Sequence, residues 1–201
     1  MFIWLAIIAV TVFLDQITKY LTIFYLKPIA TFPLIEDVLH LTYVENTGAA
    51  FGMMKDARWV FMVTSTVAIV GILVYMFRKR PTDKLLCVSL SFIVGGGIGN
   101  MIDRTILGYV VDMIDFRLIN FAVFNVADSF VCVGAGMMIL YLILDMIREA
   151  KAEKAAKEAA GTSAGTAADP ADETSAEAQS AEAQSAEAAD DQGTAKEAGH
   201  E

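Results

Sequence analysis

Histidine is rare in this 201-residue sequence, which contains only His40 and His200, far apart in the chain. A His-Glu-x-x-His zinc motif needs two histidines one helical turn apart, so the sequence excludes that motif. A serine hydrolase needs a histidine beside its nucleophile, and Ser129 has none near it in the sequence. We therefore predict that neither a metal ion nor a cofactor is required.

Cysteine is equally rare, and basic residues are missing from the start of the chain. Cys87 and Cys132 fall in apolar segments without the short spacings of metal or redox motifs, so we expect both to be small packing residues. The first apolar segment runs from Met1 to Leu26 with no preceding Lys or Arg and no obvious small-residue cleavage site. A cleaved signal peptide has those features, so we expect this segment to be retained.

Charge is unevenly distributed along the chain. The formal net charge is −9, but residues 151–201 contain four Lys and twelve Asp or Glu, which gives −8 and leaves −1 for residues 1–150. The acidic composition therefore belongs to a tail, and no nucleic-acid partner is predicted. That tail repeats Ser-Ala-Glu-Ala-Gln from Ser175 and has no large apolar residue nearby, so it cannot bury enough surface to fold alone. We predict two parts: a membrane domain over residues 1–149 and a low-complexity tail over residues 150–201.

Most of the hydrophobic residues, 56% of the sequence, precede Glu149. A membrane-spanning helix needs roughly 20 mostly apolar residues. Four segments approach this length: Phe2–Leu26, Trp59–Phe77, Leu85–Ile102 and Val126–Ile147. The sequence thus predicts an all-α membrane protein with four transmembrane helices.

Lysine and arginine predict the orientation of these helices, because they are enriched on the cytoplasmic side. Eight basic residues follow the second and fourth segments: Arg78, Lys79, Arg80, Lys84, Arg148, Lys151, Lys154 and Lys157. We therefore expect both termini to be cytoplasmic and the loops 27–58 and 103–125 to face outward. Partial alternation around 39–44 and the turn signal Asn46-Thr47-Gly48 predict a small β-sheet in the first outer loop.

Polar residues interrupt the apolar segments at a few places. Asp15 and Lys19 are four residues apart in the first segment, close enough to pair on one helix face. An ion pair that fixes helix packing is favoured over a catalytic role for them. Gln16 and Thr18 offer further interhelical hydrogen bonds. Asn46 is explained best as a turn residue, with hydrogen bonding to a bound backbone as the alternative.

The end of the third segment and the start of the fourth are also polar. Asn100, Asp103 and Arg104 close the third segment, where the two charges could simply lie at the membrane interface. Asn125 and Asp128 have the spacing of a helix N-cap and an acid at N3, and capping alone could explain both. At the end of the third segment, a buried Asn100 beside the Asp103 carboxylate would be costlier than an interfacial charge and is more suggestive of function.

Asp112 and Asp128 are the strongest catalytic candidates, because an ionisable group at a membrane boundary marks a functional site by default. A helix N-terminus favours a negative charge at Asp128, and a second carboxylate nearby would then tend to hold a proton. Such a pair can activate water and protonate a leaving group. Asp115 fits a surface acid as well as Asp112 does, and the sequence does not choose between them.

Five motifs occur together in order, and in this arrangement the chain resembles the lipoprotein signal peptidase family, bacterial signal peptidase II, over residues 1–148. The motifs are Asp15-Gln16-x-Thr18-Lys19, Asn46-Thr47-Gly48-Ala49-Ala50-Phe51-Gly52, Gly99-Asn100-x-x-Asp103-Arg104, Val110-Val111-Asp112 and Phe124-Asn125-x-Ala127-Asp128.

The resemblance implies an aspartic endopeptidase of the bacterial cytoplasmic membrane. Its substrates would be prolipoproteins, cleaved before a cysteine that carries diacylglycerol. Asp112 and Asp128 would be catalytic, and the other motif residues would have two kinds of role. Active-site or substrate-binding support is implied for Asn46, Gly48, Asn100, Arg104 and Asn125, and structural support for Asp15, Lys19 and Asp103.

We expect the protein to act as a monomer among membrane lipids, with its site at the outer face. Two other classes remain open from the residues alone. Intramembrane Asp and Lys also build proton pathways in small transporters. A scaffold that recruits partners through the acidic tail is the third class.

Overall fold

The computed structural model describes residues 3–48 and 58–165 and divides into two compact units, Met1–Met146 and Ile147–Glu201. The predicted division of the chain after residue 149 stays a prediction. Parts of two expected features, the Ala49–Gly52 end of the second motif and the repeats from Ser175, lie outside the described residues.

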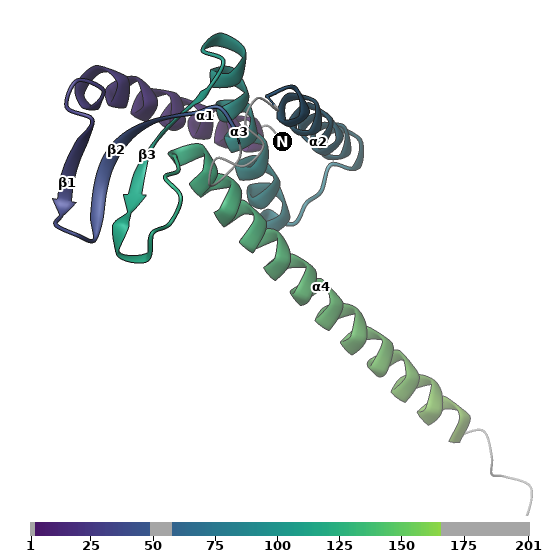
Figure 1. Cartoon of the computed structure of the whole chain (residues 1–201). Helices are drawn as coiled ribbons and strands as arrows, with labels where there is room; N and C mark the ends of the chain where they lie inside the picture. Colours follow the sequence, from purple (N-terminus) through teal and green to yellow (C-terminus); the bar gives the residue numbers. More distant parts are fainter. Residues whose placement is uncertain (1–2, 49–57, 166–201) are drawn as a thin grey trace, which may run out of the picture. The chain divides into compact units, whose positions relative to one another are not determined.

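Four long helices account for most of the first unit (Figure 1). They are α1 (Ile3–Leu21), which continues as a π-helical turn η1 (Thr22–Leu26), α2 (Arg58–Lys79), α3 (Lys84–Ile106) and α4 (Val126–Gly165). All four are long and apolar enough to cross a membrane. This confirms the four predicted spans.

Three helices are longer than predicted, and the first of them, α2, begins one residue earlier, at Arg58, and ends two residues later, at Lys79. α3 continues past Ile102, so Asp103 and Arg104 belong to its last turns, and α4 continues to Gly165. The Ala, Glu and Lys residues that extend α4 are good helix formers and include the i,i+4 pair Glu153–Lys157, joined at 2.6 Å.

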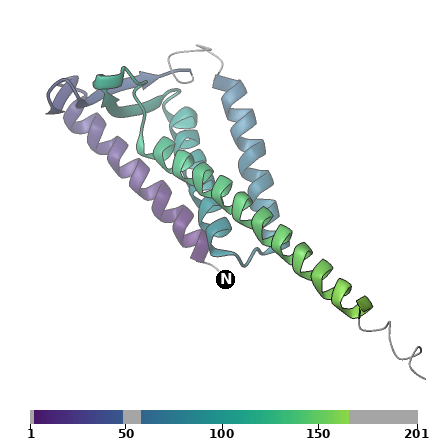
Figure 2. The ribbon, with the colours of Figure 1, turned by 90° about the horizontal axis from the view of Figure 1, so that it is seen from below.

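A three-stranded antiparallel sheet lies across the end of the helices at which α4 begins (Figure 2). Its strands are β1 (Thr31–Ile35), β2 (Leu39–Asn46) and β3 (Val110–Phe116), in the order β1-β2-β3, and β3 is followed by a 3-10 turn, η3 (Arg117–Ile119). The sequence predicted a sheet in the first outer loop alone. That prediction is incomplete, because β3 comes from the chain between α3 and α4. Strand β3 lacks a period-2 pattern because Val110 to Met113 are all buried, and a strand covered on both faces shows no alternation.

Glycines allow α3 to approach its neighbours closely. A Cβ added to Gly95 would lie 2.7 Å from Thr11 of α1, and one added to Gly96 would overlap the carbonyl oxygen of Ala127 in α4. A Cβ on Gly99 would overlap the carboxylate of Asp15. These glycines therefore form a packing face on α3 that holds α1 and the start of α4 against the same helix.

Candidate active site

A cavity of about 460 Å³ lies where the end of α3, the start of α4 and the strands β2 and β3 meet. Its polar lining consists of Asn46, Asn100, Arg104, Asp112, Asp128 and Ser129, and its apolar lining includes Val110, the segment Phe121–Phe124 and Cys132. Gly48 also lines it. Asn125 is fully buried and hydrogen-bonded to the lining residues.

Asn125 and Asp128 form a reciprocal cap at the start of α4. The backbone N–H of Asp128 donates to Asn125 Oδ1 at 2.9 Å, and the backbone N–H of Asn125 donates to Asp128 Oδ2 at 3.3 Å. The predicted capping arrangement is confirmed. It fixes the Asp128 carboxylate at the positive end of the helix, where a negative charge is favoured.

Asp112 projects from β3 into the same cavity and is 1% exposed. Asn46 Nδ2 donates to its Oδ2 at 2.9 Å, and Asn125 Nδ2 donates to its Oδ1 at 2.6 Å. Burial raises the pKa of Asp112 to about 6, and the negative charge of Asp128 adds to this increase against the two amide hydrogen bonds. Asp112 therefore keeps its proton to a higher pH than an exposed aspartate.

Two amides connect the carboxylates. Asn100 Nδ2 donates to Asp128 Oδ1 at 2.7 Å, and Asn125 Nδ2 donates both to Asp112 and, at 3.0 Å, to Asn100 Oδ1. The chain from Asp112 through Asn125 and Asn100 to Asp128 is thus continuous. It holds the two acids on one cavity wall in fixed orientations.

A buried ionic cluster lies behind this wall. Lys19 Nζ contacts Asp15 Oδ2 at 2.9 Å and Asp103 Oδ2 at 3.1 Å, and it donates to Asn100 Oδ1 at 2.9 Å. The predicted Asp15–Lys19 pair is confirmed. The lysine also reaches the amide that bridges to Asp128, so the cluster and the cavity wall are one hydrogen-bonded system.

The same cluster anchors the elements that present the two acids. Asp15 Oδ1 accepts a hydrogen bond from the backbone N–H of Ala127 at 2.9 Å, and Asp103 Oδ2 accepts one from Val111 at 3.0 Å. These residues precede Asp128 and Asp112 by one position each. Asp103 is 3% exposed, so the alternative of an interfacial surface charge is wrong for this residue.

The polar side chains of the first motif behave differently from one another. Gln16 Nε2 donates to Asp103 Oδ1 at 3.0 Å and to the Gly99 carbonyl at 3.2 Å, which confirms the interhelical hydrogen bonds expected of it. Thr18 donates only to carbonyls of its own helix, Leu14 and Asp15, among the described contacts. A threonine at this position bonds backward along the helix instead of across the interface.

Arg104 lines the cavity, and its guanidinium lies 5.6 Å from the ring centre of Phe61. It donates to the carbonyl of Asn100 at 3.3 Å. The cation is therefore directed toward the site that contains both acids. Asn46 Oδ1 accepts from the Gly48 N–H at 3.0 Å, which is the turn expected at this position.

The structure separates Asp112 from Asp115. Residues three apart on a strand point to opposite faces, and Asp115 accepts a hydrogen bond from Thr42 at 2.7 Å and pairs with Arg117 at 3.1 Å. Asp115 does not belong to the lining of the cavity. Ser129 donates to the Asn125 carbonyl at 3.0 Å, so among the described contacts its hydroxyl proton points to a backbone carbonyl and not to a side-chain base.

Some lining residues were not predicted from the sequence. The segment Phe121–Phe124 forms much of the apolar wall, and Cys132 is exposed beside it, so the expectation that both cysteines are packing residues is wrong for Cys132. Strand β3 precedes this segment, and the bridge between Ile114 and Phe124 holds the segment beside the strand. No period-2 pattern in the sequence signalled that strand. Within residues 3–48 and 58–165, no three His, Cys, Asp or Glu side chains are grouped to hold a metal ion.

The chain is similar to known proteins in sequence and in structure. The family model described as signal peptidase (SPase) II matches residues 7–144. A lipoprotein signal peptidase of Caldanaerobacter subterraneus subsp. tengcongensis is 53% identical over 65% of this chain and 89% of its own length. One from Brevibacillus brevis is 44% identical over 69% and 93%.

A solved bacterial membrane enzyme is similar in structure, with a TM-score of 0.67 and 28% identity over 73% of this chain and 90% of its own. The family model covers more than half of the chain and spans every residue assigned above to the cavity and to the ionic cluster behind it. The chain therefore belongs to the signal peptidase II family and is a multi-pass membrane peptidase.

Proposed function

We propose that this peptidase is an aspartic endopeptidase that removes signal peptides from prolipoproteins by cleaving before a diacylglyceryl-modified cysteine. The relatives' name, lipoprotein signal peptidase, supports the substrate class. The observation that carries the mechanism is that Asp112 and Asp128 line one cavity and are joined through Asn125 and Asn100.

The two acids have different environments, which suits different roles. Asp128 lies at the N-terminus of α4, which favours its negative charge, while burial and that charge favour a proton on Asp112. In the proposed reaction Asp128 removes a proton from a water molecule, and that water attacks the scissile carbonyl carbon. Asp112 donates a hydrogen bond to the carbonyl oxygen and then supplies a proton to the leaving nitrogen.

The surrounding residues orient these groups. Asn46, Asn100 and Asn125 donate to the carboxylates and prevent them from rotating, and Gly48 keeps the backbone beside Asn46 in its turn. Arg104 is the cation at the cavity and is suited to hold a carbonyl or phosphate oxygen of bound substrate or lipid. Asp15, Lys19 and Asp103 act indirectly, by anchoring the start of α4 and strand β3.

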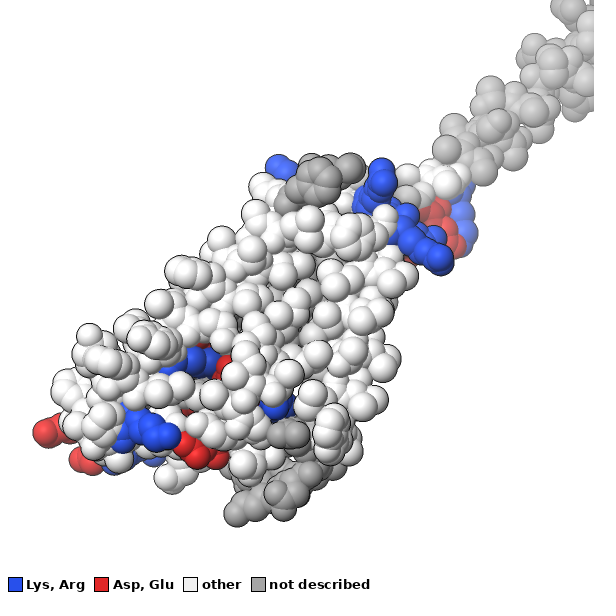
Figure 3. Space-filling view, turned by 90° about the horizontal axis from the view of Figure 1, so that it is seen from above, with Lys and Arg blue, Asp and Glu red and all other residues white. Residues whose placement is uncertain are grey.

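The apolar wall of the cavity supports a lipid-modified substrate. Phe121, Val123 and Phe124 lie beside the acids, and Phe121 is 49% exposed. A substrate anchored by acyl chains would approach along the membrane and reach such a wall without leaving the apolar phase. On the face in Figure 3, uncharged side chains form a broad band, with most charged side chains toward its ends.

The proposed orientation places both termini in the cytoplasm and the active site at the outer face of the bacterial membrane. Four of the eight basic residues behind this proposal lie between Arg78 and Lys84, at the opposite end of α2 and α3 from the sheet. Prolipoproteins are presented at the outer face after export, which is where this orientation puts the acids. Membrane lipids are the expected surroundings, a monomer is the expected state, and no nucleic-acid partner is expected.

The test is turnover by the purified full chain of two versions of one precursor peptide, with and without diacylglycerol on the cysteine. Cleavage immediately before the cysteine, and only of the lipidated peptide, is expected. Equal cleavage of both versions would remove the lipid requirement from the proposal. A proton pathway would instead give pH-dependent flux in vesicles without cleavage.

A further inference from the structure

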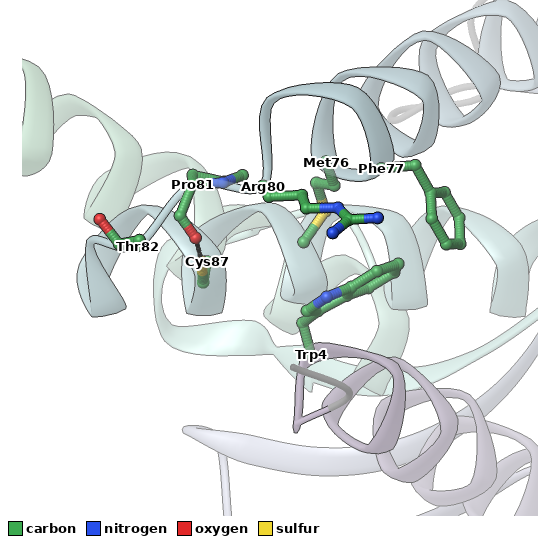
Figure 4. Close-up of a pocket in the computed structure, with 7 residues that line it drawn as sticks. All are labelled: Trp4, Met76, Phe77, Arg80, Pro81, Thr82 and Cys87. Atoms are coloured by element: carbon green, nitrogen blue, oxygen red, sulfur yellow. Dashed lines mark hydrogen bonds between the residues drawn. The ribbon is translucent and has the colours of Figure 1, made fainter.

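A second cavity, of about 470 Å³, lies at the other end of the helices from the sheet. It is lined by Trp4 near the start of α1, Met76 and Phe77 near the end of α2, the connection Arg80-Pro81-Thr82, and Cys87 in the first turn of α3 (Figure 4). None of these residues belongs to the candidate active site. The cavity is therefore a separate feature of the fold.

Most of the lining of this cavity is apolar, and its apolar part continues onto the outer surface of the helices at Phe77. The rings of Trp4 and Phe77 meet edge to face with centres 4.9 Å apart, and Met76, which belongs to the core cluster that Trp4 packs against, is 1% exposed. Phe77 is 54% exposed on a helix long and apolar enough to span a membrane. An acyl chain beside α2 could thus continue along this surface into the cavity.

Arg80 provides a cation at the mouth of this apolar space. Figure 4 shows its side chain extending along the cavity toward Trp4 and Phe77. The residue follows the last residue of α2 with φ of 47°, and its N–H donates to the Met76 carbonyl at 3.1 Å. Glycine is the usual residue at such a helix end, so a large charged side chain is present despite an unfavourable backbone conformation.

The charge around the cavity has one dominant sign. Residues 78–84 contain four cations, Arg78, Lys79, Arg80 and Lys84, and one carboxylate, Asp83. That carboxylate caps α3, because it accepts from the backbone N–H groups of Leu85 and Leu86 at 2.9 and 3.2 Å. The segment thus has an excess of positive charge where it joins two helices that are long and apolar enough to cross a membrane.

We propose that this cavity binds an anionic phospholipid, with the headgroup phosphate on the Arg80 guanidinium and one acyl chain against Trp4, Met76 and Phe77. A guanidinium binds phosphate oxygens through two parallel N–H donors, and basic cavities between membrane helices are suited to anionic headgroups. A soluble anion would use the cation but not the apolar wall. The site is independent of the proposed cleavage reaction and of the proposed orientation.

The experiment uses Trp4 as the reporter, since Trp59 is the only other tryptophan in the sequence. The full chain with Trp59→Phe is placed in lipid nanodiscs that contain either phosphatidylglycerol or phosphatidylcholine with chains brominated near the headgroup. Bromine quenches tryptophan fluorescence at contact. Phosphatidylglycerol should quench Trp4 at about fivefold lower content than phosphatidylcholine, the ratio expected from one basic residue near an anionic lipid.

Two variants separate a specific site from general attraction. Arg80→Gln should abolish the headgroup preference, whereas Arg78→Gln, which removes an identical charge two residues away and outside the cavity lining, should retain most of it. Arg80→Gly relieves the unfavourable backbone conformation, so it should lose the preference while its melting temperature stays the same or rises. Equal preference for both lipids in the parent protein, or an equal loss in Arg78→Gln and Arg80→Gln, would overturn the proposal.

Discussion

Gly99→Ala tests whether the close approach of α1, α3 and α4 positions the active site. The added Cβ would overlap Asp15 Oδ2 and lie 3.0 Å from Asp15 Cγ, against an ordinary carbon contact of about 3.5–4.0 Å. Asp15 must therefore move by roughly 0.5–1 Å. Because Asp15 also accepts from the Ala127 N–H, the start of α4 must move with it or lose that hydrogen bond.

Two effects of this substitution can be estimated. Overpacking of a well-packed core costs typically about 1–3 kcal/mol, so the melting temperature in detergent should fall. A misplacement of about 1 Å can reduce turnover by about 10²-fold even when the substitution is not at the reacting atoms. Since Asp128 follows Ala127 directly, we expect the loss to be mainly in kcat, measured on a diacylglyceryl precursor peptide.

Gly71→Ala is the matched control. Nothing lies within 4 Å of a Cβ at Gly71 in α2, so this change adds the same methyl group without a clash. Alanine is also the better helix former by about 0.8–1.0 kcal/mol, which predicts equal or higher stability and unchanged turnover. If Gly99→Ala behaves like Gly71→Ala in both assays, the close packing does not position the site and this account of the fold is wrong.

The remaining predictions concern charge, pH and the tail. Lys19→Met leaves the buried carboxylates of Asp15 and Asp103 without their cation and should cost about 3–5 kcal/mol in unfolding measurements. Lys27→Met, at an exposed ion pair, should change stability little, and similar melting temperatures of the two variants would contradict the buried cluster. Burial raises the pKa of Asp112 to about 6, so the folded state binds this proton more tightly than the unfolded chain does. The contribution of Asp112 to the free energy of unfolding should therefore fall as pH rises from about 4 to about 6 and then level off. Turnover that depends on the same proton should decline above about pH 6, about tenfold per unit at the limit, and a flat profile to pH 9 would exclude the proposed acid. Truncation after residue 150 should preserve cleavage, because the described residues that line the cavity end at Cys132. A folded but inactive truncated protein would refute this.

The elements that depend on local pattern were predictable from the sequence. The four spans follow from long apolar runs, the α4 cap follows from the Asn125 and Asp128 spacing, and the Asp15–Lys19 pair follows from i,i+4 geometry. Strand β3 was not predictable, because a strand buried on both faces has no alternation and its pairing with β2 joins residues far apart in the chain.

The choice between Asp112 and Asp115 depended on that same strand. Both are acids in one apolar run, and only the direction of each side chain relative to the sheet separates them. The register of β3 against β2 sets this direction, since a slip of one residue would exchange the two faces. The five-motif resemblance favoured Asp112, whereas the physics of the sequence alone did not choose between the two acids.

The most direct test of the proposed mechanism is turnover of a diacylglyceryl-cysteine precursor by purified Asp112→Asn, Asp128→Asn and the double variant, with Asp115→Asn as the matched control. Asparagine keeps the size and much of the hydrogen bonding but cannot transfer the proton, so each single variant should lose about 10²–10⁴-fold in turnover. The double variant should be little worse than either single one, because residues that act as a unit lose activity non-additively. Asp115→Asn should retain most activity, since its carboxylate bonds Thr42 and Arg117 outside the cavity lining. Normal cleavage by a folded, membrane-inserted Asp112→Asn or Asp128→Asn variant would contradict the proposed pair.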